Sequence, residues 1–402
     1  MNRPASESLA GPLRVLAFSD FAWPEGSGGV ERCLAEIYPR LVEAGTAAVE
    51  LITLSNGTAP RAESRDGVRI TRLPRVPLDR LLGMQVTVSA AVWPESLRAA
   101  RRFRPNLIHA HTLFFHTSIV AAVLSFWLKV PLLLTLHLGA ADALPQPYRA
   151  LTQIYERTLG RLLLKRGARI ICVSDDVVAH AITLGASREK VVMIPNGVNL
   201  AQFAPPDGDR ELPEDRNLPT VTCVGRLIMN KGQHFLLDAA SEARDRGFRF
   251  RLLFVGDGPM ESRLRDQTRA LNLNDTVEFL GHRDDVPWLL SQSDIFVRPS
   301  LTEGMSLAVL EGLAAGLPVI ATDVSGTAQM IEDGRNGFIV RPGSVADLSA
   351  ALTRLLASTE LRRSIGRAAR LRAADFDWSS VARETGREMI RARRLPRPQT
   401  YA

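Results

Sequence analysis

Short apolar runs recur along the chain, and segments long enough for helices separate them. In the first half these runs cover residues 13–18, 49–54, 107–110, 132–136 and 170–173. A glycine loop follows the first run, and a helical pattern then begins at Val30, with Cys33, Leu34, Ile37 and Leu41 on one face. Strands that alternate with helices predict a parallel sheet covered by helices on both faces.

The apolar pattern stops between Leu200 and Leu218, where prolines crowd among charged residues. It restarts as runs over residues 220–224, 250–255, 277–280, 295–298 and 319–321, which predict a second parallel sheet. We therefore expect an α/β protein with an N-terminal domain at 1–200, a linker at 201–218 and a second domain at 219–375. The remaining residues, 376–402, predict a C-terminal helix that packs back on the first domain.

Charge and composition narrow the classes of partner. The chain has 402 residues and a net charge of +7, which favours anionic partners such as nucleotide phosphates or an acidic membrane surface. Nucleic acid is disfavoured because the basic residues lack interleaved aromatics. Arginine-rich stretches at 98–104 and 391–397 can attract anionic lipid, although such runs are more often solvated helix faces.

No segment has the character of a membrane helix or a secretion signal. The apolar stretch at 118–138 is broken by Lys129 and Pro131, and the N-terminus lacks an apolar signal core. A cytoplasmic location is expected, with peripheral contact at the inner face of the cell membrane as an addition to it. Cys33, Cys172 and Cys223 lack metal-like or redox-like spacing and are interpreted as core residues.

Two cations stand where the second domain's first strand gives way to a helix. Arg226 follows that strand directly, and Lys231 precedes the helix. Ligands of open parallel sheets bind at the carboxyl ends of strands, where a helix N-terminus offers free N–H groups. The combination suits a diphosphate, although two surface residues in a loop would read the same way.

Two glutamates, Glu303 and Glu311, flank the start of another helix. Ser306 is a plausible helix cap, so Glu303 lies in the preceding loop and Glu311 lies inside the helix. Carboxylates accept hydrogen bonds from sugar hydroxyls, and the backbone N–H groups near Ser306 and Leu307 can meet a phosphate. Glu311 sits on an apolar helix and needs a partner, which argues against a merely solvated pair.

In the order and spacing of these motifs the chain resembles the retaining nucleotide-sugar glycosyltransferases of family four. The motifs are Gly28-Gly29-Val30-Glu31, Ile194-Pro195-Asn196-Gly197-Val198, Val224-Gly225-Arg226 with Lys231-Gly232, Gly256-Asp257-Gly258-Pro259, Phe279-Leu280-Gly281, and Glu303 with Glu311. The resemblance covers nearly the whole chain. It implies the two-domain GT-B fold, in which two Rossmann-like parallel-sheet domains face each other across a cleft.

The resemblance also implies roles for these residues. Arg226 and Lys231 would grip the donor diphosphate and stabilise the leaving group, Glu311 would bind the ribose, and Glu303 the transferred sugar. The backbone of Gly304, Ser306 and Leu307 would contact sugar and phosphate. Gly281 and Arg283 would border the base, and Gly28 and Gly29 would close over the diphosphate from the first domain.

Three residues after strands of the first domain are further candidates. By the same resemblance His137 lies close to the reacting sugar, although Leu138 stands where many relatives have Asp. His111 and Ser174 are candidates for the acceptor side. A histidine after a strand is otherwise more often a structural hydrogen-bonding group, and for His111 the two interpretations stay level.

The predicted activity is therefore transfer of a hexose or hexosamine, with retention, from a nucleotide-diphosphate sugar to a hydroxyl acceptor. Met305-Ser306 replaces the Phe-Gly of many relatives, which favours a UDP-sugar over a GDP-sugar. Lipid-linked glycan, polysaccharide and small-molecule acceptors all stay open, with the first two named in the prediction, and neither a cofactor nor a metal is expected. A nucleotide-sugar epimerase, a phosphorylase or a non-catalytic sugar-nucleotide-binding subunit of the same architecture remains the alternative.

Overall fold

The computed structural model describes residues 12–25, 28–77, 87–139, 148–204 and 218–395. Its contacts divide the chain into two compact units. The first unit comprises Met1–Ile194 together with Ser379–Ala402, and the second comprises Pro195–Trp378. The division falls at Ile194, shortly before the proline-rich stretch at 201–218, and residues 205–217 of that stretch lie outside the described residues.

The first unit is built on an eight-stranded sheet with the strand order β10-β9-β8-β7-β1-β2-β4-β3. Every neighbouring pair is parallel except β3 with β4. A two-stranded antiparallel ribbon, β5 with β6, lies apart from it. The strands are β1 (Leu13–Phe18), β2 (Ala47–Ser55), β3 (Arg61–Arg65), β4 (Val68–Pro74), β5 (Val76–Pro77), β6 (Thr87–Val88), β7 (Leu107–His111), β8 (Leu132–Leu136), β9 (Arg169–Cys172) and β10 (Val191–Met193).

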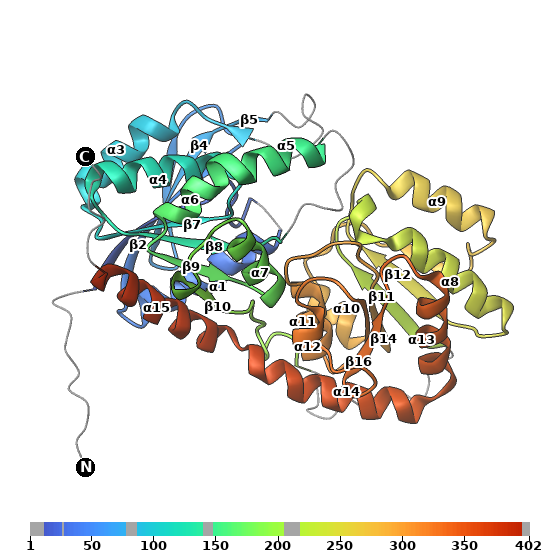
Figure 1. Ribbon diagram of the computed structural model, residues 1–402. Coiled ribbons are helices and arrows are strands. Elements are labelled where there is room, and N and C mark those ends of the chain that lie inside the picture. The colour runs from blue at the N-terminus through green and yellow to red at the C-terminus, as the bar shows by residue number, and fades with distance from the viewer. Residues whose placement is uncertain (1–11, 26–27, 78–86, 140–147, 205–217, 396–402) are drawn as a thin grey trace, which may run out of the picture. The chain divides into compact units, whose positions relative to one another are not determined.

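Helices connect these strands, as Figure 1 shows. The C-terminal helix α15 (Trp378–Arg394) lies beside α1, and its Glu388 accepts a hydrogen bond from Arg169 at the start of β9 at 2.7 Å. The other helices are α1 (Gly29–Glu43), α3 (Val92–Phe103), α4 (His116–Leu128), α5 (Tyr148–Tyr155), the π-helix η1 (Glu156–Gly160), α6 (Arg161–Arg166), α7 (Asp175–Thr183) and the 3₁₀ turn η2 (Arg188–Lys190).

The second unit is built on a six-stranded sheet, all parallel, with the order β13-β12-β11-β14-β15-β16. Its strands are β11 (Thr220–Val224), β12 (Arg251–Val255), β13 (Val277–Phe279), β14 (Ile295–Arg298), β15 (Val319–Thr322) and β16 (Gly337–Val340). Its helices are η3 (Met229–Lys231), α8 (Gln233–Asp245), α9 (Glu261–Ala270), α10 (Val286–Ser291), α11 (Leu307–Ala314), α12 (Thr327–Met330), α13 (Val345–Ala357), α14 (Thr359–Ala373) and η4 (Ala374–Phe376).

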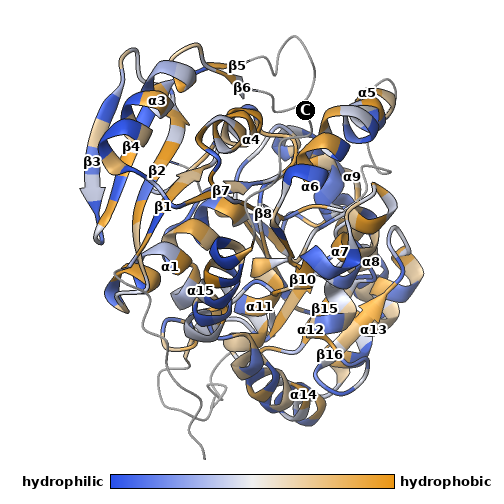
Figure 2. Ribbon diagram, turned by 60° about the vertical axis from the view of Figure 1, so that its left-hand side comes forward, coloured by the Kyte–Doolittle hydropathy of each residue, from blue (hydrophilic) through white to orange (hydrophobic). Residues whose placement is uncertain are grey.

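The buried strands were predictable, whereas the polar and short strands were not. Each apolar run expected from the sequence forms a strand, with ends that differ by at most a few residues. The sequence analysis did not predict β3, β4, β5, β6, β10 and β16, because these strands are either short or mix apolar with polar residues. In Figure 2 the contrast is plain, since β3 is largely hydrophilic and forms the antiparallel edge of its sheet.

The three cysteines belong to the buried interior of helix α1 and strands β9 and β11. Cys33, Cys172 and Cys223 are buried and free, as expected for core residues. Among the described residues, none of the helices combines the length and the apolar character needed to cross a bilayer.

Candidate functional site

In the second unit a buried arginine closes the carboxyl end of the central strands. Arg298, the last residue of β14, donates from Nη1 to the carbonyl oxygen of Val224 at the end of β11, at 2.6 Å. Gly225 adopts a φ of +143°, and a side chain there would overlap the Arg298 guanidinium. Only glycine therefore lets the chain turn away from β11 while this arginine lies beneath it.

The chain then places Lys231 at the entrance of α8. Lys231 ends the short turn η3, and Gly232 follows with a φ of +68°. A side chain at Gly232 would meet the carbonyl of Pro299, so this turn packs closely on the segment after β14. A backbone hydrogen bond from Leu301 to Asn230, at 2.8 Å, joins the same two segments.

Glu303 lies between Lys231 and Arg298. Its Oε2 accepts a hydrogen bond from Lys231 Nζ at 2.8 Å, and its Oε1 accepts one from Arg298 Nη2, also at 2.8 Å. Ser300 Oγ donates to the same Oε1 at 2.8 Å. The side chains of Lys231, Glu303 and Arg298 are only 17%, 11% and 7% exposed, so the whole group is largely withdrawn from water.

The charges in this group are unequal. Burial alone raises the pKa of Glu303, but the Arg298 and Lys231 cations outweigh burial and lower it to about 2. Burial lowers the pKa of Lys231, and the charges of Arg298 and Arg226 lower it further, against the pull of Glu303. Two cations therefore flank one ionised carboxylate, and with the nearby charge of Arg226 the group has an excess of positive charge.

Arg226 is exposed, and its position is fixed through its backbone. Gln233, in the first turn of α8, donates from Nε2 to the carbonyl oxygen of Arg226 at 2.9 Å. The Arg226 side chain faces solvent, yet its charge is close enough to Lys231 to lower the pKa of that lysine. Such an arrangement suits capture of an anion from solution.

The second glutamate lies inside α11. Glu311 is 5% exposed within this apolar helix, and Ser306 occupies the N-cap position with extended backbone. The Ser306 side chain makes no capping hydrogen bond, so the predicted cap is a matter of position alone. The preceding loop is held by Asn196, which donates from Nδ2 to the carbonyl oxygen of Met305 at 3.0 Å.

The other predicted residues of this unit lie along the same strand ends. Gly281 follows β13 and accepts a backbone hydrogen bond from Gly256 at 2.7 Å, and Gly256 in turn lies against Gly225. Arg283 is more exposed and forms a two-point pair with Asp285, at 2.7 and 2.6 Å. That pairing raises the pKa of Arg283, so this arginine is already engaged with a carboxylate.

In the first unit, Gly28 and Gly29 form the N-terminus of α1. Gly28 is the N-cap, with extended backbone and no side-chain cap, and Gly29 is the first helical residue. Ser174 is likewise an N-cap, and its Oγ accepts a hydrogen bond from the Val177 backbone at 3.4 Å. Ser174 therefore has a structural role at the start of α7.

A chain of buried hydrogen bonds leads to His137. His109 bonds Thr135 at 2.8 Å and Tyr38 at 3.0 Å, and the Tyr38 hydroxyl bonds His111 at 2.7 Å. His111 in turn bonds Nε2 of His137 at 3.1 Å. Both ring nitrogens of His111 are thus engaged inside the protein, and His137 forms the end of the chain.

Burial favours the neutral form of these histidines. The Tyr38 hydroxyl has one proton, so it donates to one histidine and accepts from the other. In their neutral forms, His109 and His111 can each donate once and accept once within this chain of hydrogen bonds. Burial lowers the pKa of His109 to about 3 and that of His137 to about 4, and it lowers the pKa of His111 well below its usual value.

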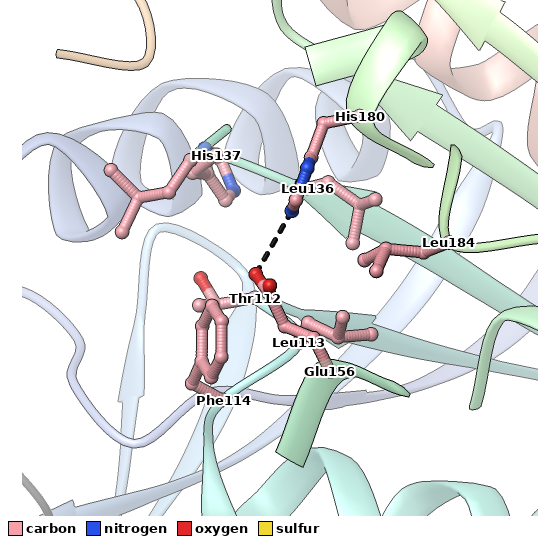
Figure 3. A pocket seen from close by; sticks show the side chains of 9 residues that line it. Thr112, Leu113, Phe114, Leu136, His137, Glu156, His180 and Leu184 are labelled. Atoms are coloured by element: carbon pink, nitrogen blue, oxygen red, sulfur yellow. Dashed lines mark hydrogen bonds and ion pairs between the residues drawn. The ribbon is translucent and has the colours of Figure 1, made fainter. Parts of the chain in front are cut away.

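A small pocket opens beside His137 (Figure 3). Its polar lining includes Thr112 and the pair formed by His180 and Glu156, whose Nε2 and Oε1 atoms lie 2.9 Å apart. Thr112 adopts a φ of +68°, which is rare for a β-branched residue, and its buried hydroxyl has no partner among the described residues. The pocket therefore combines local backbone strain with an unused hydroxyl.

Two family models match the chain over consecutive stretches. The model described as Glycosyltransferase Family 4 matches residues 27–202, and the model described as Glycosyl transferases group 1 matches residues 207–372. The chain belongs to the family-four glycosyltransferases. The two matched stretches follow the two parallel-sheet units, and this glycosyltransferase has the GT-B type of fold.

Known proteins resemble this glycosyltransferase along most of its length. Glycogen synthase of Mycobacterium tuberculosis is 27% identical over 95% of either chain. A UDP-Gal:alpha-D-GlcNAc-diphosphoundecaprenol alpha-1,3-galactosyltransferase of Escherichia coli is 29% identical over 62% of this chain and 66% of its own. The Anabaena protein HepE, in a crystal structure with UDP-glucose, superimposes with a TM-score of 0.77 at 22% identity, over 94% of this chain and 100% of its own.

Sequence reasoning missed several residues that build the site. Arg298 and Ser300, which hold Glu303, lie at the end of β14 and in the loop after it. The apolar residues before them indicate a buried strand and give no sign of a binding role. Tyr38 lies on the buried face of α1, where an aromatic residue indicates packing. Asn196 belongs to a motif that the sequence had singled out without a role, and this motif was the available signal.

The neutral histidines predict acid sensitivity of the fold. Unfolded histidines take up protons near pH 6.5, whereas His137 in the folded state does so at about 4. Acid therefore favours the unfolded state, and stability should fall as the pH drops from about 6.5 to about 4. Thermal unfolding across this range should show a smaller loss for His137→Asn than for the wild type.

The matched control is His282→Asn, since the His282 side chain is 54% exposed. Its unfolding temperature should follow the wild-type curve with pH. A His137→Asn protein whose pH dependence equals that of the wild type would contradict a buried neutral His137.

Proposed function

We propose that this glycosyltransferase moves a hexose or hexosamine from a nucleotide-diphosphate sugar to a hydroxyl acceptor, with retention of configuration. The observation that carries the proposal is the group in which Lys231 and Arg298 bind the carboxylate of Glu303 and Arg226 adds a third positive charge near Lys231. Its excess positive charge at the carboxyl ends of parallel strands suits a diphosphate. The crystal structure of HepE with UDP-glucose supports a UDP-sugar as donor.

Arg298 lets one carboxylate serve two purposes. Because Arg298 and Ser300 satisfy Oε1 of Glu303, Lys231 can turn toward a phosphate without leaving Glu303 as an isolated buried charge. Oε2 of Glu303 then becomes available to accept a hydrogen bond from a sugar hydroxyl. Binding of the donor thus exchanges one partner of Lys231 for another, with Arg298 as the constant counter-charge.

The proposed reaction breaks the bond between the anomeric carbon and the phosphate oxygen and forms a bond from that carbon to the acceptor oxygen. The acceptor approaches the same face, and its proton passes to the departing phosphate oxygen. Negative charge develops on the diphosphate as the bond breaks, and Lys231 and Arg226 stabilise it. Glu311 is assigned to the ribose and His137 to the neighbourhood of the sugar, where a neutral imidazole can exchange hydrogen bonds.

The acceptor is proposed to be a lipid-linked glycan or a polysaccharide. The name of the Escherichia coli relative specifies a diphosphoundecaprenol acceptor, and that of the Mycobacterium tuberculosis relative specifies glycogen synthesis. The strained Thr112 and its unused hydroxyl offer an acceptor hydroxyl one partner beside His137. A cytoplasmic location, with peripheral contact at the inner face of the membrane, belongs to the same proposal.

A panel of UDP- and GDP-sugars, assayed by nucleotide release with and without membrane extract, tests this function. We expect release with a UDP-sugar, dependent on acceptor and unchanged by a chelator, and a product with the donor's anomeric configuration by NMR. Conversion of the donor without acceptor would instead indicate an epimerase. Absence of release with every donor and acceptor would indicate a binding subunit.

Replacement of Lys231 tests the leaving-group role. Lys231→Ala should lower kcat by about 100-fold or more, because it removes a cation from the developing charge on the diphosphate. The KM for the acceptor should change little, since Lys231 faces the donor. Lys190→Ala, a change of the same kind in the first unit, should leave both constants at wild-type values. Unchanged turnover of Lys231→Ala would refute the role.

A further inference from the structure

The outward side of α5, η1 and α6 carries a ridge of exposed apolar residues. Leu151, Ile154, Leu159 and Leu162 are 51%, 61%, 44% and 63% exposed. Their spacing follows the helical repeat, so these side chains project from one side of the segment. Apolar residues normally turn inward in such a helix, and here the helix also has a buried side, which includes Leu163 and Leu164.

Every exposed charge on this segment is positive. Arg157 and Lys165 are exposed and interleaved with the apolar ridge, and Arg161, which is also exposed, extends toward Gly185 after α7. The one acidic residue, Glu156, is buried on the opposite side and pairs with His180. In Figure 2 hydrophobic and hydrophilic positions alternate along α5. The outward side is therefore both apolar and cationic.

The end of α4 continues the same surface. Phe126, Trp127 and Leu128 are 53%, 60% and 40% exposed, and Lys129 follows them. Arg166, at the end of α6, lies 5.6 Å from the ring centre of Phe126 and donates to Ser125 of α4 at 3.1 Å. Figure 1 shows α4, α6 and α5 beside one another in the first unit.

We call this region the α4–α6 surface, and it gathers an unusual share of the apolar exposure. Within the described part of the chain, seven of the fifteen exposed large hydrophobic residues belong to it. Large apolar side chains exposed together on neighbouring helices indicate an interaction site rather than ordinary solvent-facing surface. Its residues are Phe126, Trp127, Leu128, Leu151, Ile154, Leu159 and Leu162, with Lys129, Arg157, Arg161 and Lys165.

We propose that the α4–α6 surface docks on a bilayer that contains anionic phospholipid. Large apolar side chains with a tryptophan suit the boundary between head groups and acyl chains, and interleaved Lys and Arg suit anionic head groups. A second copy of the chain would bring the same positive charges face to face, which disfavours self-association. Charge complementarity thus selects the membrane surface.

The position of this surface next to the pocket bears on the acceptor, and this part of the inference rests on the proposed function. Glu156 belongs to the same helical segment but faces the pocket beside Thr112 and His137 (Figure 3). One segment therefore presents lipid-binding residues outward and a pocket residue inward. A lipid-linked acceptor held in the bilayer would have its head group close to that pocket.

Vesicle co-sedimentation of the full-length protein tests the docking surface. The wild type should bind phosphatidylcholine vesicles that contain phosphatidylglycerol, bind neutral vesicles poorly, and dissociate as salt is raised. Ile154→Glu/Leu162→Glu should weaken binding by about tenfold or more. Arg157→Glu/Arg161→Glu should weaken it by roughly fivefold or more for each residue.

Leu371→Glu is the matched control, since Leu371 is 75% exposed on α14 in the second unit. This variant should bind vesicles as the wild type does. Thermal unfolding and nucleotide release with a soluble acceptor confirm that each variant is folded, and they report failure of the proposed function separately from failure of docking.

Three results would overturn the docking proposal. One is equal vesicle binding by the wild type and the folded surface variants. Another is the absence of wild-type binding to anionic vesicles. The third is a dimer in light scattering that the Ile154→Glu/Leu162→Glu change dissociates, because that would make a second copy of the chain the occupant.

Discussion

The ionised carboxylate of Glu303, buried between Arg298 and Lys231, sets the constraint that the second unit must meet. A buried charge is costly unless cations and hydrogen bonds compensate it. Arg298 supplies the permanent compensation, and to reach Glu303 it must pass beneath Gly225 and cap the end of β11. The loops after β11 and β14 are thus fixed by one electrostatic requirement, and Lys231 is left as the exchangeable partner.

The buried histidines of the first unit are neutral, in contrast to the buried ion pairs of the second unit. His109, His111 and His137 are kept neutral and linked through Tyr38, so this unit contributes hydrogen-bonding capacity without charge. The second unit thus offers cations, and the first unit offers neutral imidazoles. Cations suit the phosphate charge of the proposed donor, whereas neutral imidazoles suit hydroxyl groups, because they donate and accept without attracting phosphate.

The α5–η1–α6 segment shows how the fold can separate two tasks across one helix. The π-helical turn η1 directs Glu156 inward to His180, while the residues around it project outward. Single π-helical turns inserted in α-helices often occur at functional sites. The same short segment thereby lines a pocket and forms part of the proposed lipid-facing surface.

The sequence by itself determined the fold class, the two parallel sheets and the family, because apolar runs and glycine motifs are local signals. It also identified Glu303, Lys231 and Arg226 by type and position. Tertiary structure alone decided that Arg298 and Ser300 hold Glu303, and that Tyr38 joins two histidines. These contacts connect residues on different strands and helices, or side chains whose direction depends on packing, and burial then sets their charge states. The exposed apolar ridge on α5 and α6 could not be predicted from the sequence either. A helix with apolar residues on two sides does not indicate which side will be buried, because packing against the rest of the unit decides that.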